Sequence, residues 1–256
     1  DMAGQVVGVA FQSLESAENI GYVVPVTVVQ HFLEDIRRHG GYTGFCSMGA
    51  RLTHLENTVF RKSLGMESHQ SGIMINYLAP MSACKSLLQK FDVILAADGI
   101  PVANDGKIPF RPGERVSLVC YVQTKFAGDS INLKILREGK EMELEAPVSM
   151  LASIVRAHWN SQPPPYLIAS GLVFTALSVP FLNAADAWDH FVSDEICYLM
   201  GHVRKPLEKE NDEIVVLCQV LAHRSNLGYD QLSDLHLTKF NGESVKSLRH
   251  ISDLLR

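Results

Sequence analysis

The sequence predicts a mainly β protein with a smaller share of helix (α+β), organised as two similar units. The first observation is a repeat: two pieces of the chain recur in the same order at one constant offset, which indicates one supersecondary unit used twice. The second is that β-branched runs in both copies end in Asp-Gly or Asn-Gly, the signature of a strand that enters a tight turn. The paired segments are residues 72–79 with 215–222, and 91–102 with 235–245.

The chain opens with two expected strands and a helix. Residues 4–13 and 20–25 are rich in β-branched side chains, and a polar loop at 14–19 separates them. Apolar side chains at i, i+3 and i+4 spacing then predict a helix over residues 26–39, ended by the glycine pair that follows. We therefore expect a strand pair followed directly by a helix.

The first repeated unit is expected at residues 42–147, as strand, helix-forming linker, strand, tight turn and helix. An insertion at 103–112 follows its Asp-Gly turn. Residues 114–125 fit a strand by alternation and a helix by an apolar stripe, and their position before the strand at 131–136 favours a helix. A Glu-Gly turn at 138–139 should close that strand.

The second unit follows a proline-rich segment, residues 160–165, which is predicted to be a stiff linker. Residues 166–182 carry no charge and approach the length of a membrane span. Interior Ser, Gly, Thr and Pro, and the lack of flanking Lys or Arg, favour a pair of buried strands instead. The unit is expected to break off inside a helix at 245–255, without a closing strand.

Composition argues against several classes of function. The 256 residues allow two domains, and the net charge of -5 provides no basic surface for nucleic acid or an anionic membrane. Five dispersed cysteines, without a Cys-x-x-Cys pair, favour buried thiols in a reducing compartment. We expect no cofactor and no metal site, because Asp186 and His190 lack a third ligand and fit a solvated loop.

Motifs along the whole chain resemble the Deg/HtrA family of serine proteases. GQVVGVAFQS and NIGYVVP are similar to the last strands of its chymotrypsin-like domain. YTGF, FDVILAADGIPV, KFAGDS and LKILREGKE are similar to its first PDZ domain, and PPPYLIASGLVF and SNLGYD to its second. The extra segment FRPGER resembles the plant-type Deg branch. The resemblance implies the last strands of a chymotrypsin-like β-barrel at 1–25, a connecting helix at 26–41, a PDZ-like β-sandwich at 42–159, a linker at 160–165 and an incomplete second PDZ-like module at 166–256.

The resemblance also implies a parent serine endopeptidase whose catalytic residues all lie outside this chain. In the family, the nucleophile stands in a Gly-Asn-Ser-Gly-Gly-Pro stretch just before the strand that begins here at Gly4, and the catalytic His and Asp lie further upstream. Residues 68–72 form no Gly-x-Ser-x-Gly elbow. By position, one set of residues would pair with the substrate backbone and another would line the primary pocket, although plain barrel strands explain both sets equally well. The two sets are Ala10, Phe11 and Gln12, and Ile20, Gly21 and Tyr22.

The PDZ resemblance implies two sites for peptide C-termini. A PDZ domain adds a peptide as a strand, and the N–H groups of a glycine-containing loop receive its carboxylate. Without the resemblance, Thr-Gly between a helix and a strand would be only a turn. The first loop would be Tyr42, Thr43, Gly44 and Phe45, with residues 45–51 as the receiving strand and Val116, Val119 and Cys120 as the helix wall. The second, a weaker match whose strand can be covered by its own chain, would be Ser170, Gly171, Leu172 and Val173.

The expected function is that of a fragment of an ATP-independent Deg/HtrA-type endopeptidase, whose PDZ modules capture unfolded proteins or peptide C-termini, regulate the enzyme and join subunits. Residues 225–230 resemble a family segment that can occupy such a groove in a neighbouring subunit. The alternative is a proteolytically inactive PDZ scaffold, and the sequence before Asp1 distinguishes the two. Family members occur in plastids, mitochondria and nuclei, so we expect an intracellular, soluble protein.

Overall fold

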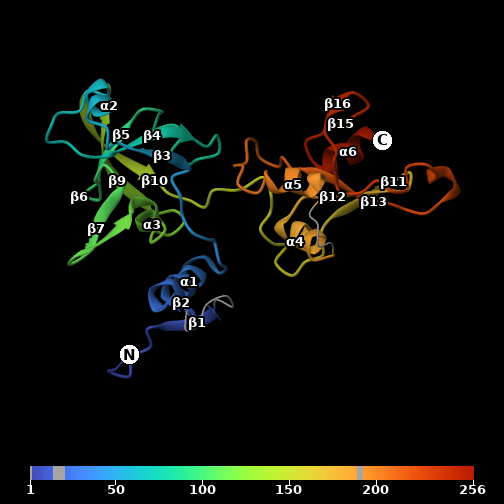
Figure 1. The fold of residues 1–256 in the computed structure, drawn as a ribbon, viewed down its shortest axis with the longest axis horizontal. Coiled ribbons are helices and arrows are strands. Elements are labelled where there is room, and N and C mark those ends of the chain that lie inside the picture. The colour runs from blue at the N-terminus through green and yellow to red at the C-terminus, as the bar shows by residue number, and fades with distance from the viewer. Residues whose placement is uncertain (1, 14–20, 189–192) are drawn as a thin grey trace. The chain divides into compact units, whose positions relative to one another are not determined.

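The computed structural model describes residues 2–13, 21–188 and 193–256, which form two compact units (Figure 1). Unit 1 comprises Asp1–Leu78 and Ser82–Met150, and unit 2 comprises Ala79–Met81 and Leu151–Arg256. Strands dominate both units and a few helices pack against them, which confirms the expected α+β class. No helix in the described ranges is long and apolar enough to cross a membrane.

Unit 1 begins with an antiparallel strand pair and a helix. Strand β1 (Gly8–Ser13) pairs with β2 (Gly21–Pro25), so the first strand starts later than its β-branched run suggested. Helix α1 (Val26–His39) follows at once, with the bounds expected from its periodicity. It ends where Gly40 adopts φ 74° and donates its N–H to the Ile36 carbonyl.

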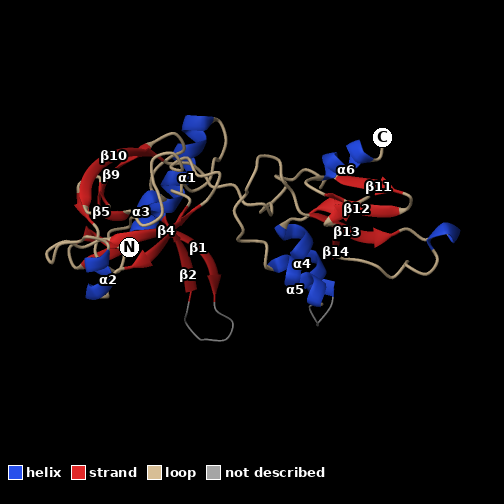
Figure 2. Ribbon diagram, turned by 90° about the horizontal axis from the view of Figure 1, so that it is seen from above, coloured by secondary structure: helices blue, strands red, loops and turns tan. Residues whose placement is uncertain are grey.

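The main sheet of unit 1 has six strands in the order β10-β9-β5-β4-β3, with β6 on β5 (Figure 2). A separate hairpin, β7–β8, and two short helices complete the unit. The strands are β3 (Ala50–His54), β4 (Ile73–Leu78), β5 (Val93–Ala97), β6 (Ile100–Pro101), β7 (Lys107–Arg111), β8 (Glu114–Ser117), β9 (Ser130–Arg137) and β10 (Lys140–Pro147), and the helices are α2 (Thr58–Ser63) and α3 (Leu118–Val122).

Both faces of the central strands of unit 1 are buried. Ile75 and Ile94 lie in one core together with Leu118 of α3. The alternate residues Met74 and Val93 lie in a second core, against which the α2 side chain Phe60 packs. Because side chains alternate across a strand, covering both faces explains why these strands read as nearly continuous apolar runs.

Unit 2 also has both faces of its sheet covered: the sheet has four strands, β11-β12-β13-β14 (Figure 2), and a small β15–β16 hairpin completes the strands of the unit (Figure 1). Val216 faces helices α4 and α5, whereas its neighbours Val215 and Leu217 face helix α6. The elements are β11 (Tyr166–Ala169), β12 (Leu172–Ala176), α4 (Val179–Trp188), α5 (Asp194–Met200), β13 (Val215–Val220), the 3-10 helix η1 (Arg224–Asn226), β14 (Leu235–His236), β15 (Lys239–Phe240), β16 (Glu243–Ser244) and α6 (Leu248–Leu254).

The repeat expected from the sequence appears as matching turns. Asp98 and Gly99 link β5 to β6 with φ 47° and 78°, and Asn241 and Gly242 link β15 to β16 with φ 49° and 86°. Two consecutive positive φ angles identify the tight hairpin turn that Asx-Gly pairs favour. The linkers before these turns differ from expectation, because the described chain forms only turns in the first linker and a single 3-10 turn in the second.

The helix expected at residues 114–125 is wrong in its first part. Residues 114–117 form strand β8, because the turn at Pro112-Gly113 folds them back onto β7, where Val116 pairs with Ile108. Helix α3 starts only at Leu118, with the Ser117 side chain accepting the Val119 N–H at its N-terminus. Tertiary pairing thus decided between two patterns that the local sequence supported equally.

Three expectations for unit 2 also need correction. The segment 160–165, expected to be a stiff linker between units, lies within unit 2, where the hydroxyl of Thr175 donates to the Pro165 carbonyl and holds it to the sheet. Two buried strands were expected at residues 166–182, but only β12 is buried. Strand β11 leaves Tyr166 and Ile168 exposed. Asp186 lies in α4 rather than in a loop, and His190 lies outside the described residues.

A buried ion pair closes the sheet of unit 1. Asp92 is 1% exposed, and its two carboxylate oxygens accept the Nε and Nη2 groups of Arg137 at 2.8 and 2.7 Å. Arg137 also donates to the Leu87 carbonyl. This bidentate arrangement joins the end of β9 to the start of β5.

Replacing Arg137 with alanine should destabilise unit 1 by about 3–5 kcal/mol, because the buried Asp92 carboxylate would lose its charge partner. Hydrogen exchange of the β5 and β9 amides measures the loss. Both tryptophans, Trp159 and Trp188, lie in unit 2, so tryptophan fluorescence should not change. The control Lys134→Ala removes an exposed ion pair with Glu141 on the same sheet and should change little. Equal effects of the two substitutions would contradict this role of the buried pair.

Candidate functional site

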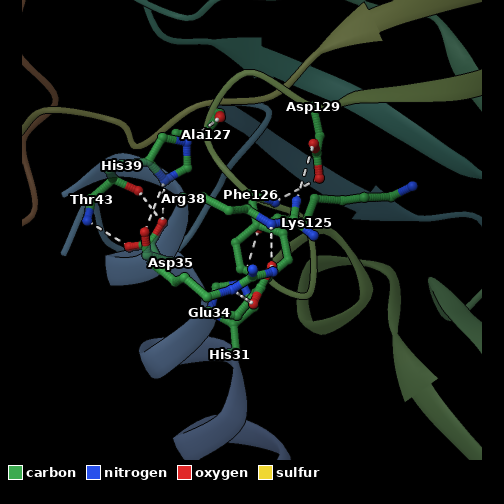
Figure 3. Close-up of polar contacts among 11 residues, drawn as sticks. His31, Glu34, Asp35, Arg38, His39, Thr43, Lys125, Phe126, Ala127 and Asp129 are labelled. Carbon is green, nitrogen blue, oxygen red and sulfur yellow. Dashed lines mark hydrogen bonds and ion pairs between the residues drawn. The ribbon is translucent and has the colours of Figure 1, made fainter. Parts of the chain in front are cut away.

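The loop expected to receive a peptide carboxylate is bonded to a carboxylate of its own chain. Asp35, the one buried residue of α1, is fully inaccessible to solvent. Its Oδ2 accepts the Thr43 N–H at 2.6 Å, and its Oδ1 accepts the Thr43 hydroxyl at 2.8 Å (Figure 3). The helix and the loop are therefore joined by charge-assisted hydrogen bonds.

Asp35 is ionised in this setting. Burial acts to raise the pKa of its carboxyl group, but the hydrogen bonds from Thr43 and from His39 outweigh it and leave the pKa below its ordinary value. The imidazole of His39 lies between two acceptors, with Nδ1 2.9 Å from Asp35 Oδ1 and Nε2 3.1 Å from the Ala127 carbonyl. Both bonds form together only when both ring nitrogens carry a proton.

A second segment of unit 1, residues 125–129, also binds α1 (Figure 3). The His31 ring stacks on Phe126 with centroids 4.3 Å apart, and its Nε2 lies 3.1 Å from the Lys125 carbonyl. The guanidinium of Arg38 covers Phe126 at 3.9 Å and meets the Asp129 carboxylate at 3.9 Å. Helix α1 is thus attached to the rest of unit 1 at two places, the Thr43 loop and residues 125–129.

The rest of the loop is free to bind. Gly44 adopts φ +95°, a conformation that side chains disfavour, and a Cβ there would lie 2.7 Å from the Met150 sulfur. Among the described residues, the Gly44 and Phe45 N–H groups donate to no protein acceptor. Tyr42 and Phe45 leave 45% and 43% of their surfaces exposed. The Tyr42 ring contacts Phe32 of α1, and the Phe45 ring stacks on His31. Two amides and the exposed parts of the two rings therefore remain available to a ligand.

The receiving strand is shorter than expected, and α3 buries other residues than those expected to form the wall of the groove. Within residues 45–51, regular pairing starts only at Ala50, where β3 begins, and Ser47 forms a single bridge with Ser149. Val119 and Cys120 face solvent and Val116 lies on β8. Leu118 and Val122 of α3 instead share a core with Cys46 and Met48.

 Leu118 and Val122 are one helical turn apart and therefore share one face of α3. Their spacing would have predicted this buried face if Ser117 had been recognised as the start of the helix.

The residues expected to contact substrate in the protease remnant lie on an exposed hairpin. Ala10 pairs with Val23 and Gln12 with Tyr22, so Phe11 is the extra residue of a β-bulge. Phe11 is 73% exposed and Tyr22 is 51% exposed. Gly21 begins β2, and Ile20 lies outside the described residues.

The second expected loop is a tight turn. Ser170 and Gly171, with φ 51° and 82°, are the two central residues of the β11–β12 hairpin, and Leu172 and Val173 belong to β12. The Gly171 carbonyl accepts the Leu221 N–H, and a Cβ on Gly171 would collide with the Asn226 amide. The glycine here permits close packing within unit 2, and the turn is not an open cradle.

A cavity of about 850 Å³ lies in unit 2 and was not anticipated from the sequence. Trp159, Tyr166 and Phe181 contribute aromatic surface, and the segment expected to be a spacer forms part of the wall. An apolar side chain or small apolar molecule suits such a lining. The lining residues are His158, Trp159, Asn160, Ser161, Gln162, Pro164, Tyr166, Thr175, Ser178, Pro180, Phe181, Ala184 and Cys218.

Neither Thr43 nor Ser225, two described residues whose hydroxyl groups are connected to a histidine through hydrogen bonds, is arranged as an activated nucleophile. The Thr43 hydroxyl donates to a carboxylate and not to an imidazole, so His39 is not placed to deprotonate it. Ser225 and His223 lie 2.7 Å apart, but His223 caps the 3-10 turn through Nδ1 and no described carboxylate orients its ring. No group of three or more His, Cys, Asp or Glu in the described ranges could hold a metal ion.

Comparisons with known proteins relate the chain to one family. A PDZ-domain family matches residues 155–256. Protease Do-like 2, chloroplastic, from Arabidopsis thaliana is 34% identical over 256 residues, which cover 98% of this chain and 41% of that protein. Putative protease Do-like 3, mitochondrial, from the same plant is 33% identical over 254 residues, covering 99% and 44%. Among solved structures, the HtrA-type protease AlgW with a decapeptide aligns with 64% of this chain and 45% of that chain, at 22% identity and a TM-score of 0.42.

The chain spans less than half the length of these curated relatives. The relatives nevertheless match nearly all of this chain, and the matched residues extend through both units. Over nearly its whole length, the chain is thus similar to plant proteases of the Deg/HtrA type.

Proposed function

We propose that the part of unit 1 that follows α1 is the peptide-capturing PDZ module of an ATP-independent Deg/HtrA-type serine endopeptidase that acts on unfolded proteins. The observation that carries this proposal is the loop at residues 42–45, where Gly44 adopts a positive φ and the Gly44 and Phe45 amides have no acceptor in the described part of the chain. Such amides suit the carboxylate at a peptide C-terminus. The exposed rings of Tyr42 and Phe45 suit its last side chains.

Unit 2 is proposed to serve subunit assembly. Its segment 225–230 is held rigid, because the Tyr229 hydroxyl lies 2.9 Å from both the Ser225 carbonyl and Asn226 Oδ1. Leu227 protrudes from this segment with 77% of its surface exposed. A rigidly presented apolar side chain is a typical anchor for a partner surface, here another subunit of the same protein.

The β1–β2 hairpin is proposed to complete the substrate side of the protease domain. Phe11, Tyr22 and Val23 leave more than half of their surfaces exposed, as is expected of strands that pack against further parts of a barrel. The two Arabidopsis relatives described above carry chloroplastic and mitochondrial names. We therefore place the parent protein in a plastid or a mitochondrion.

The 256-residue chain alone should not cleave unfolded casein, because no described hydroxyl is paired with an oriented imidazole. Release of fluorescent casein fragments measures the activity, and the full-length protein is the positive control. Cleavage that survives repurification and is blocked by a serine-directed inhibitor would contradict the expectation. An inactive full-length protein would instead favour the PDZ scaffold.

Gly44→Ala should weaken binding of free-acid peptides by roughly five- to thirtyfold, since a side chain at φ +95° costs about 1–2 kcal/mol and collides with Met150. Fluorescence anisotropy with a free-acid peptide library and its amidated counterpart measures the loss. Gly113→Ala is the matched control, because it introduces the same kind of strain at φ +80° in the remote β7–β8 turn. Equal binding of acid and amide peptides would show that the loop binds no C-terminus.

Leu227→Asp should weaken self-association of the full-length protein roughly tenfold or more, because it places a charge on the proposed anchor. Sedimentation velocity over a range of concentrations measures the oligomer. Val59→Asp, at a 74% exposed position of α2, is the control for an added surface charge. If a version ending at Met150, where unit 1 ends, forms the same oligomer, unit 2 does not drive assembly.

A further inference from the structure

Helix α1 places a carboxylate on the loop that we propose to bind peptide carboxylates. Asp35 accepts the Thr43 N–H at 2.6 Å and the Thr43 hydroxyl at 2.8 Å, and no solvent reaches it. A terminal carboxylate that enters this loop would seek the same N–H group. The loop of unit 1 is therefore partly occupied by its own chain.

Two physical effects make the Asp35 carboxylate and the terminal carboxylate of a peptide compete for the same loop. An N–H group carries one hydrogen, so the Thr43 amide cannot make a full hydrogen bond to both. A second negative charge beside Asp35 would also be repelled, and repulsion is strong where water is excluded. The two free amides of the loop, at Gly44 and Phe45, cannot remove that repulsion.

The charge of Asp35 already extends over the loop. Burial is the larger cause of the raised pKa of the Tyr42 hydroxyl, and the Asp35 carboxylate adds to it. Burial also raises the pKa of the Cys46 thiol, with further contributions from Asp129 and Asp35. Residues on both sides of the Thr43–Gly44 pair thus experience a field that disfavours an incoming anion.

We propose that Asp35 is an internal stand-in for a peptide C-terminus and competes with it for the Thr43 amide, so that peptide binding displaces the last turn of α1. This inference rests on the proposed function of the loop. It adds that the empty site is held closed by the helix and that ligand binding and release of the helix turn are one event.

The position of Asp35 in the chain connects this event to the protease remnant. Asp35 lies in the second half of α1, and the first residue of that helix directly follows β2. The His39 bonds to Asp35 and to the Ala127 carbonyl would break with the turn, whereas the His31 stack on Phe126 lies one turn earlier. Occupancy of the loop therefore changes how α1 connects the β1–β2 pair to the rest of unit 1.

Asp35→Asn provides the direct test, because asparagine keeps the shape of the side chain and removes its charge. Binding of a free-acid peptide to the whole chain, measured by fluorescence anisotropy, should tighten by about tenfold or more, while binding of the amidated peptide should not change. Glu34→Gln is the matched control. Glu34 is the neighbouring acidic residue of α1, and among the described residues its carboxylate bonds to Arg37 and Arg38 and to no residue of the loop.

Hydrogen exchange on the wild-type chain gives a second test that does not depend on the folding of a variant. The Gly40 N–H is bonded to the Ile36 carbonyl and reports the last turn of α1. Adding the free-acid peptide should accelerate exchange across residues 36–40 and leave the β9 amides unchanged.

The outcomes separate this inference from the function on which it rests. If wild type prefers the free acid over the amide but Asp35→Asn binds no more tightly, or if peptide slows exchange at residues 36–40, competition is wrong and the peptide site stands. If neither wild type nor Asp35→Asn prefers the free acid, the peptide site is wrong, and competition fails with it.

Discussion

A buried carboxylate governs the geometry of the candidate site. An ionised group without solvent must be supplied with donors, and Asp35 obtains them from Thr43 and His39. These bonds hold the end of a helix, the loop that follows it and, through the Ala127 carbonyl, a distant segment of the same unit. Moving the helix end or the loop would leave the buried Asp35 carboxylate with fewer hydrogen-bond donors, and moving the Ala127 segment would remove the acceptor that helps to hold the His39 ring. The loop therefore owes its conformation to a side chain eight residues earlier as much as to its own glycine.

The features that could be predicted from the sequence are those set by local chemistry. The apolar spacing of α1 and the glycine that ends it are properties of one segment, and the helix has the expected bounds. The two Asx-Gly turns were also predictable, since a pair of positive φ angles restricts which residues can occupy them. The central strands were readable because both of their faces are covered, so that neither face carries the polar alternation of an exposed strand.

The features that could not be predicted depend on partners far along the chain. Residues 114–117 became a strand because a turn brought them beside β7, not because their own pattern excluded a helix. That change moved the start of α3 and rotated its buried face onto Leu118 and Val122. The segment 160–165 likewise has the composition of a spacer, yet it packs on the sheet of unit 2 and lines a cavity. Amino-acid composition predicts how a segment behaves without tertiary contacts. In this segment, contacts with the sheet of unit 2 determine the structure instead.

The two glycine-containing loops show why a motif alone does not define a site. At Gly44 the positive φ accompanies two amides that have no acceptor among the residues the structure describes, while at Gly171 the positive φ completes a hairpin and lets Asn226 pack against it. The same residue type thus opens one loop and closes the other, and the difference lies in the surrounding chain. Asp35 shows the converse case, because an acidic residue on an amphipathic helix would be expected to face solvent. Its burial against the loop is visible only in the folded unit, and it makes the occupancy of the first loop a property of the helix as well as of any peptide.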